Sequence, residues 1–533
     1  MNPAIASRIP LVCRPKPPGL PLEARIAELT ALTVEPPGAD HHQRVARASG
    51  VLNFAALIAS DTGLHLTPST PPFSWCAVLI IGSGPAGLFA ADQLRRAGIT
   101  DVVIVEKGKA MNDRVCPAGG ACECRLCDVL EGEGGAGSFS DGKITLSATR
   151  GTHGQQLFTS AQEILLAEVE ATVRRFVPEG VCYEPVASLT ALEGCDEADL
   201  QFESYRLLHI GSDGVRRFGQ RYSAFLQQQG VRVLTGTEAT ELTIRQGRAT
   251  GAVVHHRRAR RSWSVQAGCV VVAVGLMGTA WLEDQLRDAG VELVTGPADI
   301  GIRLETSAAA LEPLIGEFYD FKVSHTSSTG LTVRSFCVNG NGFVVNEYHR
   351  PIGIRGVNGH SFLDRRSGLS NLAILATVDE AFTPDPKAYV RQVAHAVNTG
   401  AQGYPVRQSL AEFAPDAASA APQGIQASNP KTRPERLDRL LPPSLVEAFT
   451  SYIRAVGAVL PPVLSPDTVI YAPEIKYYNY RVPVEWQTWQ SRDITGLFVV
   501  GNAAGYTASF SAAALAGVIA GRAIAHRRPT HVR

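Results

Sequence analysis

The chain has 533 residues, and its 50 basic and 50 acidic side chains give a formal net charge of zero at pH 7. Hydrophobic residues make up 45% and charged residues 19% of the sequence, a composition typical of globular proteins. A chain of this length has room for about three or four domains. The balanced charge argues against a nucleic-acid binder or a polybasic membrane binder, because both need a surplus of Lys and Arg.

Cysteine content and the N-terminal residues bear on the cellular compartment. Ten cysteines in so long a chain do not make a disulfide scaffold. The first residues lack the apolar segment of a secretory signal, so we expect a cytoplasmic protein. Residues 503–521 carry no charge and approach the length of a membrane span. They are rich in Gly, Ala and Ser and follow a strand-like run, which favours a buried terminal helix and no membrane contact.

Residues 1–72 are expected to form a small α+β module of their own. Proline-rich stretches at 15–21 and 68–72 are typical of boundaries and linkers. Helical spacing occurs at 22–32 and 45–58, without a chemical motif. A packing or interaction role is the simplest interpretation.

A strand–turn–helix–strand unit follows this module. Residues 76–81 are an apolar run of strand length, typical of a buried parallel strand. A helix is expected over 88–97 and a second strand over 102–105, and between them the chain reads Gly82-Ser83-Gly84-Pro85-Ala86-Gly87. In this context a G-x-G-x-x-G turn indicates a dinucleotide site.

Each glycine of the turn has a mechanical role in that interpretation. Gly82 allows the tight turn, Gly84 lets a pyrophosphate approach the backbone, and Gly87 lets the helix pack against the strand. The helix N-terminus offers free N–H groups and a partial positive charge to phosphates. Glu106 follows the second strand, where an acidic side chain binds ribose hydroxyls.

Later segments add to the same sheet. A helix is expected over 220–229, a strand over 231–235, a β-meander over 238–254 and buried strands over 270–275 and 497–500. The basic run at 255–261 lies between strand-like segments, which favours a solvated hairpin tip over a nucleic-acid site.

The far end of the chain favours FAD over NAD. Residues 496–505 read as a strand that runs into Gly501 and Asn502. This segment resembles the second FAD motif of two-part flavoprotein folds, in which an Asp holds the ribityl chain. Asn502 replaces that Asp and retains a hydrogen bond without the charge.

The chain as a whole resembles a bacterial family of FAD-dependent dehydrogenases, also described as NAD(FAD)-utilising proteins. The matching stretches are 82–87, 106–108, 134–143, 299–303, 334–337, 472–474 and the Gly501 segment. The resemblance implies an α/β, Rossmann-like FAD fold in two parts, a parallel sheet plus a β-meander. It further implies an inserted substrate or cap domain and a small α+β N-terminal module, but it supplies no substrate.

On this basis we divide the chain into six segments. Residues 1–72 are the N-terminal module. The FAD-binding domain comprises 73–146, 211–275 and 466–533, and the insertions comprise 147–210 and 276–465.

A glycine-rich segment at 132–143 suits backbone that must pass close to a flat ring, and the flavin is the natural ring. Lys143, one of eight lysines in the chain, is a candidate catalytic residue, because a cation near the flavin N1 and C2 carbonyl stabilises negative charge there. Asp141 is the second catalytic candidate. A structural loop with a surface lysine is the alternative.

The expected cofactor-binding residues come from the turn, the glycine-rich segment and the later strands. They are Gly82, Ser83, Gly84, Pro85, Ala86, Gly87, Glu106, Lys107, Gly134, Gly135, Gly137, Ser138, Ser140, Ala239, Gly275, Gly501 and Asn502.

Four cysteines, Cys116, Cys122, Cys124 and Cys127, fall within twelve residues. Four thiolates could hold an iron–sulfur cluster or a zinc ion, and two could form a redox dithiol beside the flavin. The spacing matches no standard ferredoxin or zinc-finger pattern. Metal ligands, a redox dithiol and packed thiols therefore all stay open.

No second dinucleotide motif occurs in a strand–helix context, so three electron routes remain. They are transient NAD(P)H docking, oxidation by oxygen or another acceptor, and delivery from a redox partner protein. The leading interpretation is an FAD-dependent dehydrogenase or reductase that acts on a small organic substrate by hydride transfer at the flavin. The alternatives are a flavin-dependent monooxygenase and a flavin-bearing RNA-modification or assembly factor.

Overall fold

The computed structural model describes residues 73–116, 126–147, 150–152, 157–158, 160–185, 195, 198–476 and 480–527. The chain divides into two units, Met1–Thr70 and Pro71–Arg533. The expected N-terminal module lies outside the described residues, and so do Cys122 and Cys124. The fold described below is that of the second unit.

A parallel sheet forms around β1 (Trp75–Ile81), with the strand order β20-β21-β22-β10-β1-β2-β7. Its other strands are β2 (Val102–Val105), β7 (Arg232–Leu234), β10 (Arg261–Val272), β20 (Val484–Glu485), β21 (Gln490–Ser491) and β22 (Leu497–Val499). β1 pairs in parallel with β10 and β2, and β22 and β7 extend the sheet in parallel on either side. Residues 76–81 are all buried, as the unbroken apolar run predicts.

A β-meander joins one end of β10. It consists of β8 (Thr237–Arg245) and β9 (Arg248–His256), each antiparallel to the next. Gln246 and Gly247 connect β8 to β9 with φ of 50° and 69°, as two-residue hairpin turns require. The basic run turns between β9 and β10, and residues 258–260 are exposed, so the expected hairpin tip is confirmed.

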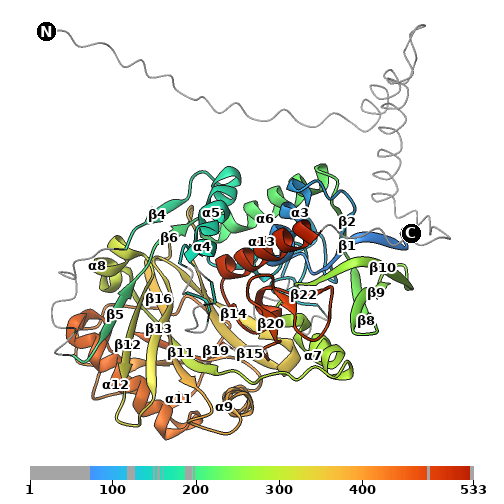
Figure 1. Cartoon of the computed structure of the whole chain (residues 1–533). Coiled ribbons are helices and arrows are strands. Elements are labelled where there is room, and N and C mark those ends of the chain that lie inside the picture. Colours follow the sequence, from blue (N-terminus) through green and yellow to red (C-terminus); the bar gives the residue numbers. More distant parts are fainter. Residues whose placement is uncertain are drawn as a thin grey trace, which may run out of the picture. The chain divides into compact units, whose positions relative to one another are not determined.

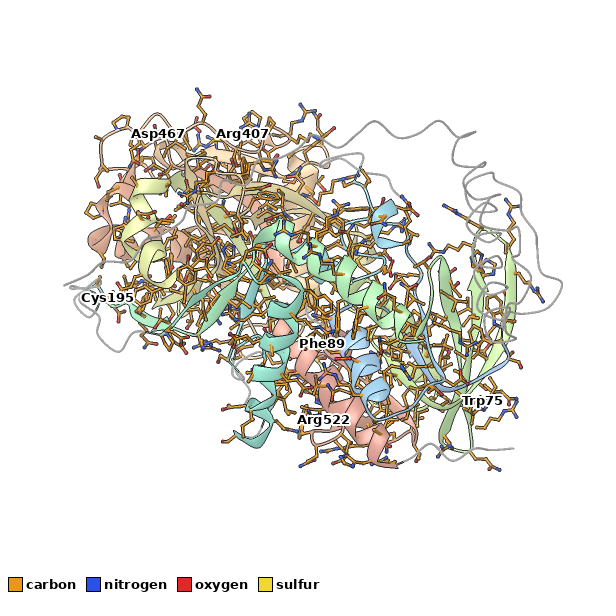
Figure 2. The ribbon with its side chains drawn as sticks, turned by 90° about the horizontal axis from the view of Figure 1, so that it is seen from above. Trp75, Phe89, Cys195, Arg407, Asp467 and Arg522 are labelled. Carbon is orange, nitrogen blue, oxygen red and sulfur yellow. The ribbon has the colours of Figure 1, made fainter. Side chains whose placement is uncertain are left out.

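Helices cover this sheet, and two of them pack on each other through small residues. They are α3 (Pro85–Arg96) and α13 (Phe510–Arg527), which carry Phe89 and Arg522 in Figure 2. A Cβ at Gly517 of α13 would lie 2.2 Å from the Ala86 carbonyl oxygen of α3. The uncharged stretch therefore belongs to a short 3-10 turn and a buried helix, and no described helix is long and apolar enough to cross a membrane.

The remaining helices of this half are α4 (Ser160–Glu163), α5 (Leu165–Phe176), α6 (Gly211–Gln228) and α7 (Thr279–Asp288). A three-stranded sheet contains β3 (Lys143–Thr145), β4 (Val181–Tyr183) and β6 (Leu207–His209). Short 3-10 helices span Met111–Asp113, Ala136–Phe139, Leu276–Gly278, Arg350–Ile352, Pro461–Leu464 and Gly501–Ala504.

A second sheet is mostly antiparallel and has the order β18-β17-β19-β11-β16-β13-β12-β5. Its strands are β5 (Gln201–Ser204), β11 (Ala298–Ser307), β12 (Phe321–Thr326), β13 (Thr332–Asn339), β16 (Leu369–Val378), β17 (Val406–Ser409), β18 (Arg433–Pro434) and β19 (Val469–Lys476). A hairpin of β14 (Phe343–His349) and β15 (Ile354–His360) lies beside it. β19 corrects one expected boundary: it begins after residue 466, yet it pairs with β11 and β17 of this sheet rather than with the FAD-binding sheet.

Helices cover one face of the second sheet. They are α8 (Ala308–Phe318), α9 (Pro386–Gly400), α10 (Leu410–Phe413), α11 (Leu437–Leu440) and α12 (Pro443–Val459), and in Figure 1 α9, α11 and α12 lie away from α3 and α13. Alternate residues point to opposite faces of a strand. Ile300, Ile302 and Val323 belong to the apolar core, whereas Lys322 and Arg334 line a cavity. The sheet thus has one apolar face and one polar face.

The close packing of α13 on α3 gives a stability prediction. Gly517→Ala is expected to lower the free energy of unfolding by about 2 kcal/mol, because overpacking a tight contact costs about 1–3 kcal/mol. Gly316→Ala in α8 is the control, since its Cβ meets nothing closer than 3.6 Å, and it should be neutral or slightly stabilising. Urea unfolding of both variants measures the difference, and equal stabilities would contradict the packing argument.

Candidate active site

A cavity of about 900 Å³ is lined by both sheets. From the parallel sheet and its turns come Gly84 and Glu106, and from the second sheet come Lys322, Phe336 and Lys476. Segments far apart in sequence therefore share one continuous hollow. A cavity of this size falls in the range of cofactor sites.

The glycines of the dinucleotide turn divide into two kinds. A Cβ at Gly82 would lie 2.4 Å from the Ala273 carbonyl oxygen, and one at Gly87 would lie 2.1 Å from the Gly82 carbonyl oxygen. These two glycines are needed for packing within the protein. A Cβ at Gly84 would meet nothing closer than Gly135 Cα at 3.7 Å, and Gly84 lines the cavity. Its missing side chain leaves room for a ligand at the N-terminus of α3.

Glu106 is fixed at the end of β2 with its side chain buried. Its Oε2 accepts hydrogen bonds from the Ser83 backbone N–H (3.0 Å) and hydroxyl (2.8 Å), and its Oε1 accepts one from the Gly108 N–H at 2.9 Å. The carboxylate is thus held beside the turn and lines the cavity. Lys107 donates to the Met277 carbonyl oxygen at 3.0 Å and pairs with Glu131.

The expected cofactor-binding residues fall into two sets. Those that line the cavity are Gly82, Gly84, Pro85, Ala86, Glu106, Lys107, Gly135, Gly137, Ser140, Gly275, Gly501 and Asn502. Those outside the lining are Ser83, Gly87, Gly134, Ser138 and Ala239. Ser83 acts through Glu106, Gly87 packs against the turn, and Ala239 pairs with Val254 in the meander.

The residues present fit FAD. Gly84 leaves a clear cradle at a helix N-terminus, where N–H groups suit a pyrophosphate. Glu106 supplies the acceptor that ribose hydroxyls need. Gly501 and Asn502 bring the C-terminal segment to the same cavity, which is the arrangement expected for a two-part FAD site.

The glycine-rich segment crosses the dinucleotide turn. A Cβ at Gly135 would lie 2.7 Å from Gly84 Cα, and the Gly134 N–H donates to the Ser83 carbonyl oxygen at 3.0 Å. Gly134 and Gly135 have φ of 82° and 65°, which favours glycine. The close approach that the structure shows is thus to the backbone of the turn.

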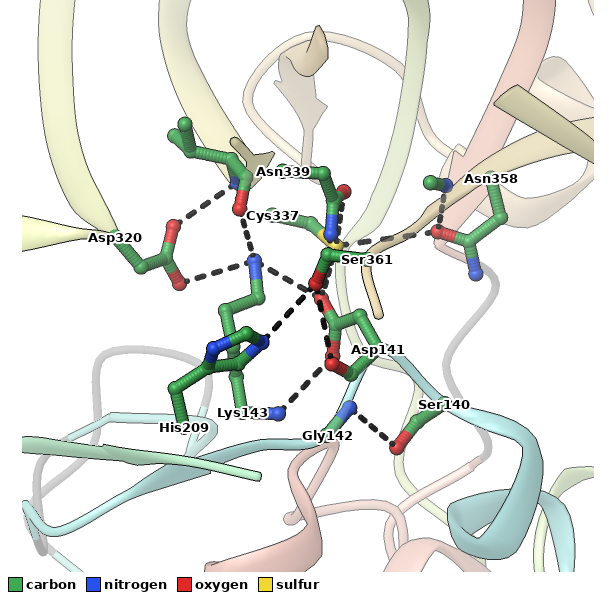
Figure 3. Close-up of polar contacts among 12 residues, drawn as sticks. Ser140, Asp141, Gly142, Lys143, His209, Asp320, Cys337, Asn339, Asn358 and Ser361 are labelled. Atoms are coloured by element: carbon green, nitrogen blue, oxygen red, sulfur yellow. Dashed lines mark hydrogen bonds and ion pairs between the residues drawn. The ribbon is translucent and has the colours of Figure 1, made fainter. Parts of the chain in front are cut away.

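Lys143 follows this segment and lies in a buried cluster (Figure 3). Its Nζ donates to the Val338 carbonyl oxygen at 2.7 Å and pairs with Asp141 Oδ2 at 2.9 Å and Asp320 Oδ2 at 3.4 Å. Burial opposes the ammonium charge, but the two carboxylates outweigh it and raise the pKa of Lys143 above its usual range. Burial is likewise outweighed at Asp141, whose pKa Lys143 holds well below its usual range. Both groups are charged at neutral pH.

Cys337 and Asn339 complete the shell around Asp141. The Cys337 Sγ donates to Asp141 Oδ2 at 2.9 Å, and the Asn339 amide donates to the same oxygen at 3.3 Å. Burial and the neighbouring Asp141 carboxylate raise the pKa of Cys337 to about 12. The thiol therefore stays protonated at neutral pH and serves as a hydrogen-bond donor rather than a thiolate nucleophile.

Three ion pairs join residues of the wall of the second sheet. Arg303 and Glu474 are fully buried and pair through two hydrogen bonds of 2.6 and 2.8 Å. Arg334 pairs with Asp299 at 2.6 Å, and Lys476 Nζ lies 3.1 Å from Glu474. All of these residues except Lys476 come from the family-like stretches at 299–303, 334–337 and 472–474. From the sequence only Glu474 is given a role, a structural one. The signal available was charged residues two positions apart in apolar strands, Arg303 and Glu305 on β11 and Glu474 and Lys476 on β19.

The described part of the cysteine cluster is Cys116, which is exposed, and Cys127, which is buried. The Cys127 backbone N–H donates to Glu131 at 2.8 Å. Within the described ranges, no group of three His, Cys, Asp or Glu side chains is placed to hold a metal ion. Because Cys122 and Cys124 lie outside those ranges, the metal-site prediction stays a prediction.

Comparisons with known families agree with this geometry. Residues 77–341 match the FAD binding domain, and residues 310–476 match the C-terminal domain-like region of FAD-dependent proteins. The chain is an FAD-dependent oxidoreductase. The expected fold class and cofactor are therefore confirmed for this oxidoreductase.

Individual relatives are distant. A protein of Clostridium beijerinckii described as uncharacterized is 23% identical over 469 residues, which is 83% of this oxidoreductase and 79% of the relative. A glutamyl-tRNA reductase of Frankia casuarinae is 30% identical over 141 residues, so the match spans about a quarter of each chain, 25% and 28%. A flavoprotein/dehydrogenase structure from Cytophaga hutchinsonii has a TM-score of 0.39 and 12% identity, with coverage of 85% and 78%.

The role of Gly84 can be tested by filling its cradle. Gly84→Val is expected to abolish FAD binding while the fold is kept, because the side chain would enter the space of the pyrophosphate rather than the protein. Flavin absorbance per protein and far-UV circular dichroism measure the two effects. Gly316→Val on the exposed face of α8 is the control and should keep its flavin. A Gly84→Val protein that purifies with full flavin content would refute the assignment.

Proposed function

We propose that this FAD-dependent oxidoreductase is a dehydrogenase or reductase of a small organic molecule. One observation carries the proposal: a single cavity is lined both by the dinucleotide turn with Glu106 and by the polar face of the second sheet. One part of the cavity suits a cofactor and the other suits a substrate. FAD, when bound, supplies the hydride chemistry, and the protein supplies binding, orientation and charge.

The residues that would bind FAD follow from the hydrogen-bonding groups that line the cavity. Gly84 and the N-terminus of α3 would bind the pyrophosphate, and Glu106 would bind ribose hydroxyls. Ser140, Gly501 and Asn502 line the same cavity and would contact the remainder of the cofactor. Asn502 would donate or accept one hydrogen bond without adding a charge.

Lys143 and Asp141 are proposed as the catalytic pair. Lys143 lines the cavity, and its raised pKa keeps the proton on Nζ. A fixed ammonium stabilises negative charge that develops nearby during reduction. Asp141 holds Lys143 in place and keeps Cys337 turned toward the cluster.

The electron donor and the setting complete the proposal. NAD(P)H would dock transiently over the cavity, or a redox partner protein would deliver electrons. The enzyme would work in the bacterial cytoplasm without nucleic acid. If the cysteine cluster binds a metal or forms a redox dithiol, it would act in addition to the hydride transfer at the flavin.

Replacing Lys143 by Met tests the catalytic pair. We expect Lys143→Met to keep FAD, to lower the flavin reduction potential and to slow reduction about a hundredfold, because losing one such donor costs about 3 kcal/mol in the transition state. Dye-coupled titration and anaerobic stopped-flow reduction with NAD(P)H or dithionite measure the two quantities. Lys431→Met on the exposed surface is the matched control and should change neither.

Two further variants separate catalysis from structure. Removing Lys143 leaves Asp141 and Asp320 without their cation, so Lys143→Met with Asp320→Asn restores the balance of charge if the single variant does not fold. Lys143→Arg keeps the charge and should keep most of the potential. An unaltered potential in a folded Lys143→Met protein would remove Lys143 from the site. Incorporation of one oxygen atom into product would replace the dehydrogenase by a monooxygenase.

A further inference from the structure

Lys322 is a cation in the cavity wall that has no ion-pair partner among the described residues. It lies on β12 and lines the cavity, and its side chain is half-buried. Within the described ranges its ammonium takes part in no ion pair or hydrogen bond. Buried or half-buried charges are ordinarily paired. A half-buried lysine without such a partner is therefore a candidate for binding an anion.

The carboxylates around Lys322 are already engaged. Glu203 lies opposite it on β5 and pairs with Arg150. Asp299 receives both Nη groups of Arg334, at 3.2 and 2.6 Å. Asp320 accepts from the Tyr205 hydroxyl at 2.8 Å and the Val338 N–H at 3.0 Å, and it lies beside Lys143.

The other groups close to Lys322 add positive charge. Burial, and after it Arg150 and Arg334, lower the pKa of Lys322 to about 8. The ammonium is still mostly protonated at neutral pH, but burial and the two guanidinium groups disfavour its charge. A bound anion would relieve this cost, since an opposite charge nearby favours the protonated form.

Neighbouring side chains suit the rest of a small acid. Ser324 follows Lys322 on the same face of β12 and lies opposite Arg334 on β13, so all three residues line the same part of the cavity wall. Phe336 lies two residues beyond Arg334 and lines the cavity, which provides an apolar surface. Cationic, hydroxyl and aromatic groups thus share one stretch of wall.

We propose that Lys322, together with Arg334 and Ser324, binds the carboxylate of a small organic-acid substrate. The inference rests on the proposed function and names the substrate class of that same cavity. Asp299 pairs with Arg334, Glu203 with Arg150 and Asp320 with Lys143, and among the described residues no carboxylate forms an ion pair with the Lys322 ammonium. A single ammonium matches a monoanionic carboxylate better than a phosphate dianion. Lys322 is therefore a specificity-determining residue that positions the acid.

Small anions test the proposal, because formate fits any carboxylate site. The holoprotein is titrated with formate and benzoate, with their neutral amides formamide and benzamide, and with inorganic phosphate. Thermal unfolding midpoints and flavin difference spectra report binding. We expect saturable binding of both carboxylates, none of the amides, and weaker binding of phosphate. Carboxylate affinity should fall as the pH rises through about 8, because Lys322 then loses its proton.

Variants of Lys322 test whether formate binds at this residue. Lys322→Met is expected to weaken formate binding about tenfold or more, since hydrogen bonds to charged groups are worth about 1.5–3 kcal/mol. Lys322→Arg should retain most of it, and Lys431→Met should bind as the wild type does. If Lys322→Met does not fold, the comparison of acids with amides and the pH dependence in the wild type decide the matter.

Specific outcomes would overturn the proposal. Amides that bind as well as acids, a folded Lys322→Met protein with wild-type formate affinity, or phosphate that binds more tightly than formate would each do so. The proposed function fails separately. Lys322-dependent formate binding, read from the unfolding midpoint, in a protein whose flavin is not reduced by any donor would refute the dehydrogenase and leave the anion site.

Discussion

The ammonium of Lys143 joins two segments of the site that are far apart in the sequence. It bonds Asp141 of the glycine-rich segment on one side and the Val338 carbonyl oxygen and Asp320 of the second sheet on the other. A buried charge that loses its partners is destabilising, so these contacts favour the arrangement in which the two segments meet. The glycine-rich segment in turn crosses the dinucleotide turn at Gly84. Lys143, together with the hydrogen bonds of Cys337 and Asn339 to Asp141, therefore helps to place the dinucleotide turn relative to the second sheet.

The second sheet contributes through the alternation of its strands. Its apolar residues pack under α8, α9 and α12, and its polar residues face the cavity. Polar groups on a buried wall are stable only when they are bonded. The Arg303–Glu474 pair meets this condition with every major polar atom engaged, and it carries Asn371 as a further partner at 2.7 Å. These bonds hold the side chains of the wall in fixed positions within the structure, which suits a surface that orients a substrate.

Contacts between residues close in the sequence can be predicted from it, and contacts between residues far apart in the sequence cannot. The turn at 82–87, Glu106 and the buried strands could be predicted because each depends on neighbours within a few residues. The Arg303–Glu474 pair could not, because its partners are 171 positions apart and a charged residue in a strand does not name its partner. The expected boundary at 466 places the residues of β19 in the FAD-binding domain for a related reason, since they precede the FAD-binding segment in sequence, whereas β19 pairs with β11 and β17. The roles of Asp320 and Cys337 depend on contacts of β12 and β13 with the glycine-rich segment. The sequence does not show which segments are in contact, so these roles could not be predicted from it.

Two lysines of the same cavity show how charge balance separates structure from binding. Lys143 has two carboxylates and a carbonyl oxygen around its ammonium, and its pKa is raised despite burial. Lys322 is desolvated by burial and has two guanidinium groups nearby, and its pKa is lowered. The first lysine has its partners within the chain and therefore serves to join segments and to present a constant charge. The second has no ion-pair partner among the described residues, although the Asp299 and Asp320 carboxylates lie close enough to favour its charge. Because Asp299, Asp320 and Glu203 pair with other cations, the Lys322 ammonium is available for an anion from outside.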